Sequence, residues 1–153
     1  MTVLANYKIL TFETGAAAPF ATRLLADLGA AVIKVEMLEG DTSRDWDGVC
    51  NGLSAGFVWL NRNKQSLTLN LKSEEGRKIF MQLAADVDVV LENFKPGVVT
   101  RLGIDYEAIK AVNHDIVYGH ISGFGQRGPY RDEKAYDMII QCPSSEHLAQ
   151  MAA

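Results

Sequence analysis

The amino-acid sequence predicts an α/β fold built on an open, mostly parallel sheet with crossover helices. Short runs of β-branched and apolar residues alternate with amphipathic stretches, an order typical of strands joined by helices. The chain has 153 residues, 48% hydrophobic and 22% charged, which is the composition of one globular domain. A domain of this size removes roughly 68–70% of its unfolded-chain surface from water, enough for a core without disulfides or structural metals.

Five runs have the length and residue types of strands: residues 7–12, 31–36, 66–71, 87–92 and 116–121. The first predicted helix begins at Pro19, which suits a first helical position, and ends at Gly29. Its large apolar residues share one face: Phe20, Leu24, Leu25 and Leu28.

Two further helices are predicted from their capping residues. Ser73 is an N-cap for a helix through Ala84, and Asp105 caps a short helix that ends at Asn113. The residues of the longer helix expected to face inward are Ile79, Phe80 and Leu83.

The charge balance argues against nucleic acid and anionic lipid as partners. Fifteen basic and nineteen acidic residues give a formal charge of -4 and a pI near 5.3, which still leaves room for a local basic pocket. Cys50 and Cys142 have no metal spacing, and the first residues do not resemble a signal peptide. No apolar run approaches the ~20 residues that cross a bilayer. We therefore expect a cytoplasmic protein with no metal and no membrane partner.

Ligands in open α/β sheets bind beyond the carboxyl ends of the strands. The segments that follow the predicted strands are residues 13–18, 37–56, 93–97 and 122–134. In or beside them lie six cations of the types that bind phosphate: Arg62, Lys64, Lys72, Lys95, Arg101 and Lys134. Composition alone favours ordinary solvated charges, because Lys and Arg are mostly exposed in every protein.

A dinucleotide site is one alternative that the sequence suggests. Gly15 follows the first strand, and Glu36 ends the second strand where a ribose-binding acid would stand. However, residues 14–19 contain one glycine where the motif needs three, and Pro19 removes a helix-start N–H. The pattern therefore disfavours a nicotinamide or flavin site.

Asp137 is the most interesting carboxylate, because it follows a glycine-rich turn and precedes an apolar run. A carboxylate in such a place can serve as an acid/base group, and a helix N-cap is the favoured alternative. The three histidines have no partner at metal or triad spacing and are expected to be structural or exposed: His114, His120 and His147. Cys142 is expected to be a small buried side chain.

Many short motifs occur in order along nearly the whole chain. They are ADLGA at 26–30, VIKVE at 32–36, GD at 40–41 with Arg44, NRNK at 61–64, EGR at 75–77, ENF at 92–94, PG at 96–97, RLG at 101–103, SGFGQ at 122–126, GPY at 128–130, and AYD at 135–137 with Gln141. Together they resemble the family III CoA-transferases, the group that includes formyl-CoA transferase, carnitine CoA-transferase and alpha-methylacyl-CoA racemase.

The resemblance implies that residues 1–153 are the N-terminal part of a Rossmann-like large domain that binds coenzyme A, without the small domain or the C-terminal return segment. It also implies an interlaced homodimer acting on an acyl-CoA and a small carboxylic acid. By residue-wise carry-over, the CoA-binding residues are Leu69, Lys72, Asn93, Phe94, Arg101, Leu102, Lys134 and Tyr136.

Transferases of this family use an aspartate that forms an acyl-enzyme anhydride and then a CoA thioester. That aspartate is expected beyond residue 153, so the chain alone is predicted to have little or no transferase turnover. Ala16 stands where formyl-CoA transferase has a glutamine, which argues against oxalate-type specificity.

Two alternatives stay open. Asp137 aligns with the acid/base carboxylate of the racemases, although Tyr136 replaces their preceding histidine and no second acid/base is evident. The chain could instead be a non-catalytic remnant that binds CoA or associates through apolar surface.

Overall fold

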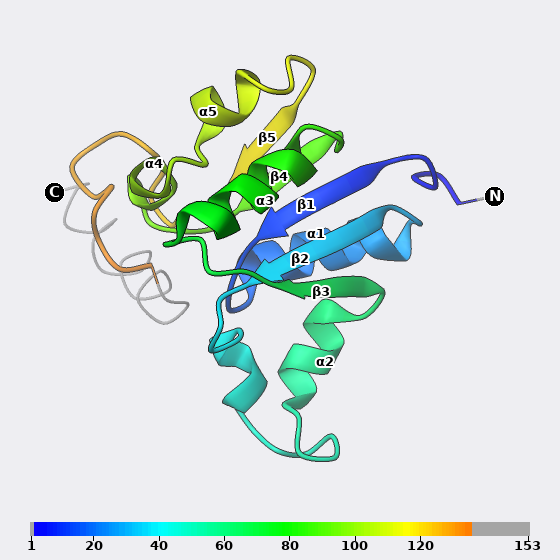
Figure 1. The fold of residues 1–153 in the computed structure, drawn as a ribbon. Coiled ribbons are helices and arrows are strands. Elements are labelled where there is room, and N and C mark those ends of the chain that lie inside the picture. Colours follow the sequence, from blue (N-terminus) through cyan, green and yellow to red (C-terminus); the bar gives the residue numbers. More distant parts are fainter. Residues whose placement is uncertain (1, 136–153) are drawn as a thin grey trace, which may run out of the picture. The chain divides into compact units, whose positions relative to one another are not determined.

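The computed structural model describes residues 2–135, in two compact units that span residues 2–121 and 122–135. In the first unit, five strands form one sheet in the order β3-β2-β1-β4-β5, and all neighbours run parallel (Figure 1). The strands are β1 Lys8–Phe12, β2 Ala31–Glu36, β3 Lys64–Thr68, β4 Val89–Glu92 and β5 Val117–His120. The predicted α/β class with a parallel sheet is therefore confirmed.

The order of the strands reverses at β1. The chain passes outward from β1 to β2 and β3, then returns to place β4 and β5 on the other side of β1. The connecting helices are α1 Ala17–Asp27, the 3-10 helix η1 Thr42–Asp45, α2 Ala55–Asn61, α3 Glu74–Ala84, α4 Val98–Leu102 and α5 Tyr106–Lys110. The switch point between β1 and β4 is where open α/β sheets place their ligands.

The two faces of the sheet carry different interiors. Helices α3, α4 and α5 cover the main apolar core, made of Leu10, Phe12, Val35, Leu69, Leu71, Phe80, Ala84, Val87, Val90, Val99, Ile104, Ile109 and Ile116. Helix α1 covers the opposite face, as Figure 1 shows, with a smaller cluster of Ile9, Ala26, Ala30 and Val32. Because neighbouring side chains on a strand point to opposite faces, Thr11 and Lys34 also lie on the α1 face, and both are buried.

Of the four large apolar residues predicted for the inner face of α1, only Leu25 packs against the sheet-side cluster, and it is partly buried. Phe20, Leu24 and Leu28 are 40%, 42% and 48% exposed. The residues that face the sheet are small, Ala18, Thr22 and Ala26 among them, which lets the helix lie close to the strands. The helix also begins at Ala17, two residues before the predicted start at Pro19.

Two other details differ from the prediction. Phe80 of α3 is buried as expected, but Ile79 is 43% exposed. Strand β3 begins at Lys64 rather than at residue 66 and ends at Thr68. Leu69, the next residue, is buried in the apolar core. The chain then turns into α3, where a Cβ on Gly76 in the first turn of the helix would lie 2.1 Å from the Asn70 carbonyl oxygen, so this position requires glycine.

Residues 122–135 form no helix or strand. Gly125 and Gly128 have φ angles of +81° and +100°, and the rings of Phe124 and Tyr130 pack at 5.8 Å between centroids. The predicted glycine-rich turn is therefore present. Within residues 2–135, every helix is too short or too polar to span a lipid bilayer.

Candidate functional site

Side-chain hydrogen bonds join the segments after β1 and β4 at the switch point. The Thr14 N–H donates to Oδ1 of Asn93 at 3.0 Å, and Nδ2 of Asn93 donates to the Thr14 carbonyl at 2.8 Å. The following residue, Phe94, stacks its ring on that of Phe12 in β1, with the ring centroids 4.3 Å apart. These contacts continue the pairing of β1 and β4 beyond the ends of both strands.

The buried carboxylate of Asp41 holds the same loop from the side of β2. Its Oδ1 accepts from the Thr14 hydroxyl at 3.1 Å and from the Gly15 N–H at 3.2 Å, and its Oδ2 pairs with Lys34. Burial alone would raise the pKa of Asp41, but hydrogen bonds from Lys34 and Ser43 outweigh it and lower the pKa below its ordinary value. Asp41 is therefore an ionised anchor for the loop after β1.

Asp41 belongs to a larger group of charges on the α1 face, which we term the buried ion-pair layer: Glu13, Lys34, Glu36, Asp41, Arg44 and Lys64. Its members pair as Lys64 with Glu13 at 2.8 Å, Arg44 with Glu36 at 2.7 Å, and Lys34 with Asp41. Asn61 Oδ1 accepts from both lysines, at 3.0 and 3.1 Å. Three positive and three negative groups are thus matched where water is largely excluded.

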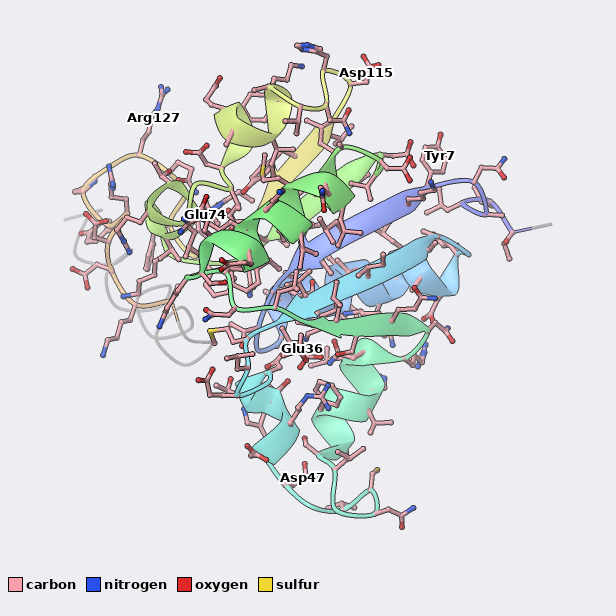
Figure 2. All side chains as sticks on the ribbon, in the orientation of Figure 1. Tyr7, Glu36, Asp47, Glu74, Asp115 and Arg127 are labelled. Atoms are coloured by element: carbon pink, nitrogen blue, oxygen red, sulfur yellow. The ribbon has the colours of Figure 1, made fainter. Side chains whose placement is uncertain are left out.

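Glu36 is fully engaged within this layer. Its carboxylate accepts from Arg44, from the Ser66 hydroxyl at 2.7 Å and from the Asp41 N–H at 3.0 Å. Burial acts to raise the pKa of Glu36, but these donors outweigh it and lower the pKa. Figure 2 labels Glu36 near the end of β2. A ribose-binding role for Glu36 would need to break this pairing, which further disfavours a dinucleotide site at this residue.

His120 has a structural role, one of the two roles predicted for it, and its partner is a residue that the sequence spacing did not indicate. Its Nδ1 pairs with Oε1 of Glu92, whose side chain is only 2% exposed. Oε2 of Glu92 accepts from the Phe94 N–H at 2.7 Å. Burial raises the pKa of Glu92, with the Phe94 N–H and His120 acting against it. His114, in contrast, is exposed as expected.

Three of the predicted cofactor-binding residues gather at the apolar core. Leu69 is buried in it, and Phe94 and Leu102 pack against it while staying partly exposed. Asn93 uses its amide on the Thr14 backbone. The structure thus places Leu69, Asn93 and Phe94 directly after the carboxyl ends of β3 and β4, and Leu102 at the end of α4.

The predicted phosphate-binding cations divide into two groups. Lys64 is buried against Glu13, and Arg62 pairs with Asp27 at 2.6 Å, so both are already engaged. Lys72, Lys95 and Arg101 are exposed, and none of them has an acidic partner within 4.0 Å among residues 2–135. Gly97, with φ of +83°, turns the chain into α4 and lies close to the Arg101 guanidinium.

The remaining predicted residues lie elsewhere in the chain. Lys134 is exposed in the unit of residues 122–135. The other residues singled out from the sequence lie outside the described residues: Tyr136, Asp137, Cys142 and His147. Among residues 2–135, no cluster of three or more His, Cys, Asp or Glu side chains is arranged to bind a metal ion.

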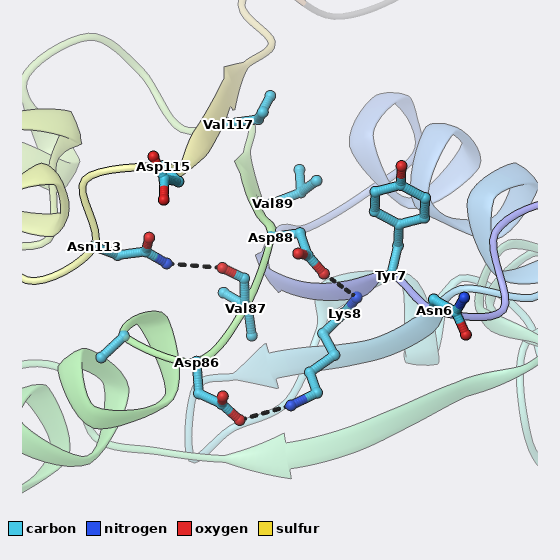
Figure 3. A pocket seen from close by; sticks show the side chains of 11 residues that line it. Asn6, Tyr7, Lys8, Asp86, Val87, Asp88, Val89, Asn113, Asp115 and Val117 are labelled. Carbon is cyan, nitrogen blue, oxygen red and sulfur yellow. Dashed lines mark hydrogen bonds and ion pairs between the residues drawn. The ribbon is translucent and has the colours of Figure 1, made fainter.

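An open pocket of about 500 Å³ lies at the opposite end of the sheet (Figure 3). It is lined by the amino ends of β1, β4 and β5, where Lys8 pairs with Asp86 at 2.7 Å. Asp88 and Asp115 add further negative charge. A polyphosphate would be repelled there, so the carboxyl ends of the strands are the better candidate site.

The sequence contained a signal for the charged anchors that the motif analysis did not use. Lys34 lies inside strand β2, and Glu92 ends strand β4, whose other residues are apolar. A charge inside a buried strand requires a paired partner, because an isolated buried charge is very costly. The identity of each partner depends on topology, since Lys34 meets Asp41 across a loop and Glu92 meets His120 across strands.

A model of the CoA-transferase family III matches residues 4–150. The chain belongs to this family. A protein of Fusarium pseudograminearum named acyl-CoA transferase is 42% identical over 146 residues, covering 89% of this chain and 32% of its own. The acetyl-CoA:oxalate CoA-transferase of Acetobacter aceti is 43% identical, covering 86% and 34%. The human succinyl-CoA:glutarate CoA-transferase is 41% identical, covering 92% and 33%.

Two solved structures have the same fold as this chain. A CaiB/BaiF family protein from Brucella suis superposes with a TM-score of 0.88 at 42% identity, covering 92% of this chain and 39% of its own. A hypothetical protein from Mycobacterium tuberculosis superposes with a TM-score of 0.89 at 31% identity, covering 95% and 41%. The chain spans about a third of the length of the curated relatives it matches.

Proposed function

We propose that residues 1–153 form the N-terminal part of the CoA-binding large domain of a family III CoA-transferase, which moves coenzyme A between small carboxylic acids. The family match and the names of the relatives support the activity. The observation that carries the proposal for this chain is that three exposed cations, Lys72, Lys95 and Arg101, lie within three residues along the chain of three residues in or against one apolar core, Leu69, Phe94 and Leu102.

This pairing of side chains suits the chemistry of coenzyme A. Its phosphates need cations that are not already neutralised, and Lys72, Lys95 and Arg101 meet that condition. Its adenine and pantetheine need apolar surface, which the partly exposed Phe94 and Leu102 can supply. In this proposal Asn93 acts by holding Thr14, and Lys134 and Tyr136 are further CoA-binding residues that the family resemblance implies. Acyl-CoA and a carboxylic acid are the substrates, and the site requires no metal.

The covalent steps are assigned to an aspartate beyond residue 153. Its carboxylate would attack the acyl-CoA thioester, forming an anhydride and expelling the CoA thiolate, which then attacks the aspartyl carbonyl and releases the donor acid. Attack by the acceptor carboxylate and return of the thiolate complete the exchange. Residues 1–153 contribute binding and orientation, so we expect CoA binding without turnover.

Calorimetric titration with coenzyme A tests the binding role directly. Arg101→Ala removes one charge-assisted phosphate contact and should weaken binding by about 1.5–3 kcal/mol, which is about 10- to 150-fold in Kd. Lys8→Ala is the matched control, because it removes the same charge at the amino ends of the strands. Equal affinities of wild type and Arg101→Ala, or no binding by the wild-type chain, would contradict the proposal.

An association role is the second candidate, favoured by the exposed apolar face of α1 and α2. Leu24 and Leu28 lie on this face, and Phe20 stacks on Trp59 at 5.4 Å between centroids with Arg23 over both rings. Contiguous apolar surface of this kind is typical of contacts between chains. A second copy of the chain is the proposed occupant, consistent with a homodimer. Light scattering should show a dimer, and Leu24→Lys should shift it to monomer; a monomeric wild type would contradict this role.

A further inference from the structure

The Glu92–His120 pair lies directly under the turn that carries Asn93 and Phe94. Glu92 is the last residue of β4, and its side chain turns back to accept the Phe94 N–H at 2.7 Å. The other carboxylate oxygen pairs with Nδ1 of His120, the last residue of β5. The backbone adds one more link, because the Ile121 N–H donates to the Glu92 carbonyl at 2.9 Å.

Three consecutive residues are thereby held by three different parts of the fold. The side chain of Glu92 reaches β5, the amide of Asn93 reaches the loop after β1, and the ring of Phe94 stacks on Phe12 of β1. Only the Glu92 contact fixes the direction of a backbone N–H in the turn. The orientation of the peptide before Phe94 therefore depends on the rotamer of Glu92.

Nδ1 is the atom of His120 through which this rotamer is held. An ionised carboxylate can only accept a hydrogen bond, so in a pair with ionised Glu92 it is Nδ1 of His120 that donates. Nε2 is buried and has no hydrogen-bond partner among residues 2–135. Without the imidazole, the buried Glu92 carboxylate would keep the Phe94 N–H and the Tyr118 hydroxyl as partners but would lose its contact with His120, and it would gain by rotating toward another donor or by binding a proton.

We propose that His120 is a positioning residue for CoA binding, which acts through Glu92 to fix the Phe94 N–H and the turn of residues 93–97. This inference rests on the proposed function, because it assumes that the turn contributes to the CoA site. His120 itself need not contact the ligand. Its contribution is the geometry that presents the Phe94 ring and leads through Gly97 into the helix of Arg101.

Two near-isosteric variants separate this role from a direct contact. His120→Asn places an amide N–H close to the position of Nδ1 and should keep the bond to Glu92. His120→Gln places its amide closer to the position of Nε2 and should lose that bond. Amide hydrogen exchange at Phe94, followed by NMR on the full 153-residue chain, reports the turn without any ligand.

We expect His120→Gln to speed exchange at Phe94 and weaken CoA binding, each about tenfold, the effect of losing roughly one hydrogen bond. His120→Asn should restore both values toward wild type, and Glu92→Gln should reproduce the loss. The free energy of unfolding, measured by urea titration, is the control for a general loss of stability. It should be the same in His120→Gln and His120→Asn, so that the difference between these variants at Phe94 reports the turn alone.

Two results would overturn the inference. Unchanged Phe94 exchange in all variants would show that His120 does not position the turn. Full CoA binding by His120→Gln with loss in His120→Asn would show that Nε2 is the working atom. Absence of CoA binding by the wild-type chain contradicts the proposed function instead, and the exchange data then still decide whether His120 holds the turn.

Discussion

The two faces of the sheet bury different kinds of side chain. Beneath α3, α4 and α5 the interior is apolar and continuous, from Leu10 in the central strand to Ile116 before β5. Beneath α1 the buried ion-pair layer fills positions that apolar residues could have occupied. Apolar packing is non-directional, whereas paired charges require a defined geometry. The apolar face therefore supplies most of the stability, and the charged face fixes the loops after β1 and β2.

Breaking one pair in the charged face should give the largest loss of stability. Asp41→Ala leaves Lys34, only 1% exposed, without its partner, and the expected cost is about 3–5 kcal/mol in the free energy of unfolding. Urea titration followed by circular dichroism measures this change. The double variant Lys34→Met with Asp41→Leu removes both charges and should recover much of the loss, because no charge is then left buried alone. Failure to recover would show that the layer contributes net stability.

A cavity in the apolar face should lower the free energy of unfolding slightly less than Asp41→Ala does. No second substitution is expected to restore that loss as the double variant does for the ion pair. Leu10 is fully buried at the centre of the main core, and Leu10→Ala is expected to destabilise by about 2–5 kcal/mol. Leu10→Met, which nearly conserves volume, should cost less than about 1.5 kcal/mol. The same urea titration applies. Equal losses for alanine and methionine would mean that shape, rather than buried volume, limits this face.

The contrast between the faces also marks what could be predicted from the sequence. Alternating strand and helix patterns predicted the parallel sheet, and β2 occupies its predicted residues 31–36. The orientation of α1 could not be predicted, because its apolar pattern does not distinguish a face against the sheet from a face left exposed, as Leu24 shows. The partner of His120 was missed because Glu92 lies 28 residues away and becomes a neighbour only when β4 pairs with β5.

Acid should weaken the charged face selectively. The pKa values of Asp41 and Glu36 in the folded chain lie below their ordinary values of 3.8 and 4.5. A lowered pKa in the folded state gives stability that is complete above the ordinary pKa and is lost as the pH falls toward the folded pKa. The free energy of unfolding should thus decline as the pH falls below about 4.5, and Asp41→Asn should flatten that decline. Glu92 affects the pH dependence of stability in the opposite direction, because burial raises its pKa and the folded state therefore binds a proton more readily than the unfolded state. A pH profile unchanged by Asp41→Asn would contradict this assignment.

The smallest expected effect comes from the rim of the apolar face. Ser73 caps α3 by accepting the Gly76 N–H at 3.0 Å, and the bond is partly exposed to water. Ser73→Ala should cost about 1 kcal/mol, because water can replace part of the lost bond. Ser73→Asp keeps an acceptor at the helix N-terminus and should preserve stability. A loss from Ser73→Ala as large as that from Asp41→Ala would remove the distinction between the two faces, because a half-exposed cap would then matter as much as a buried ion pair.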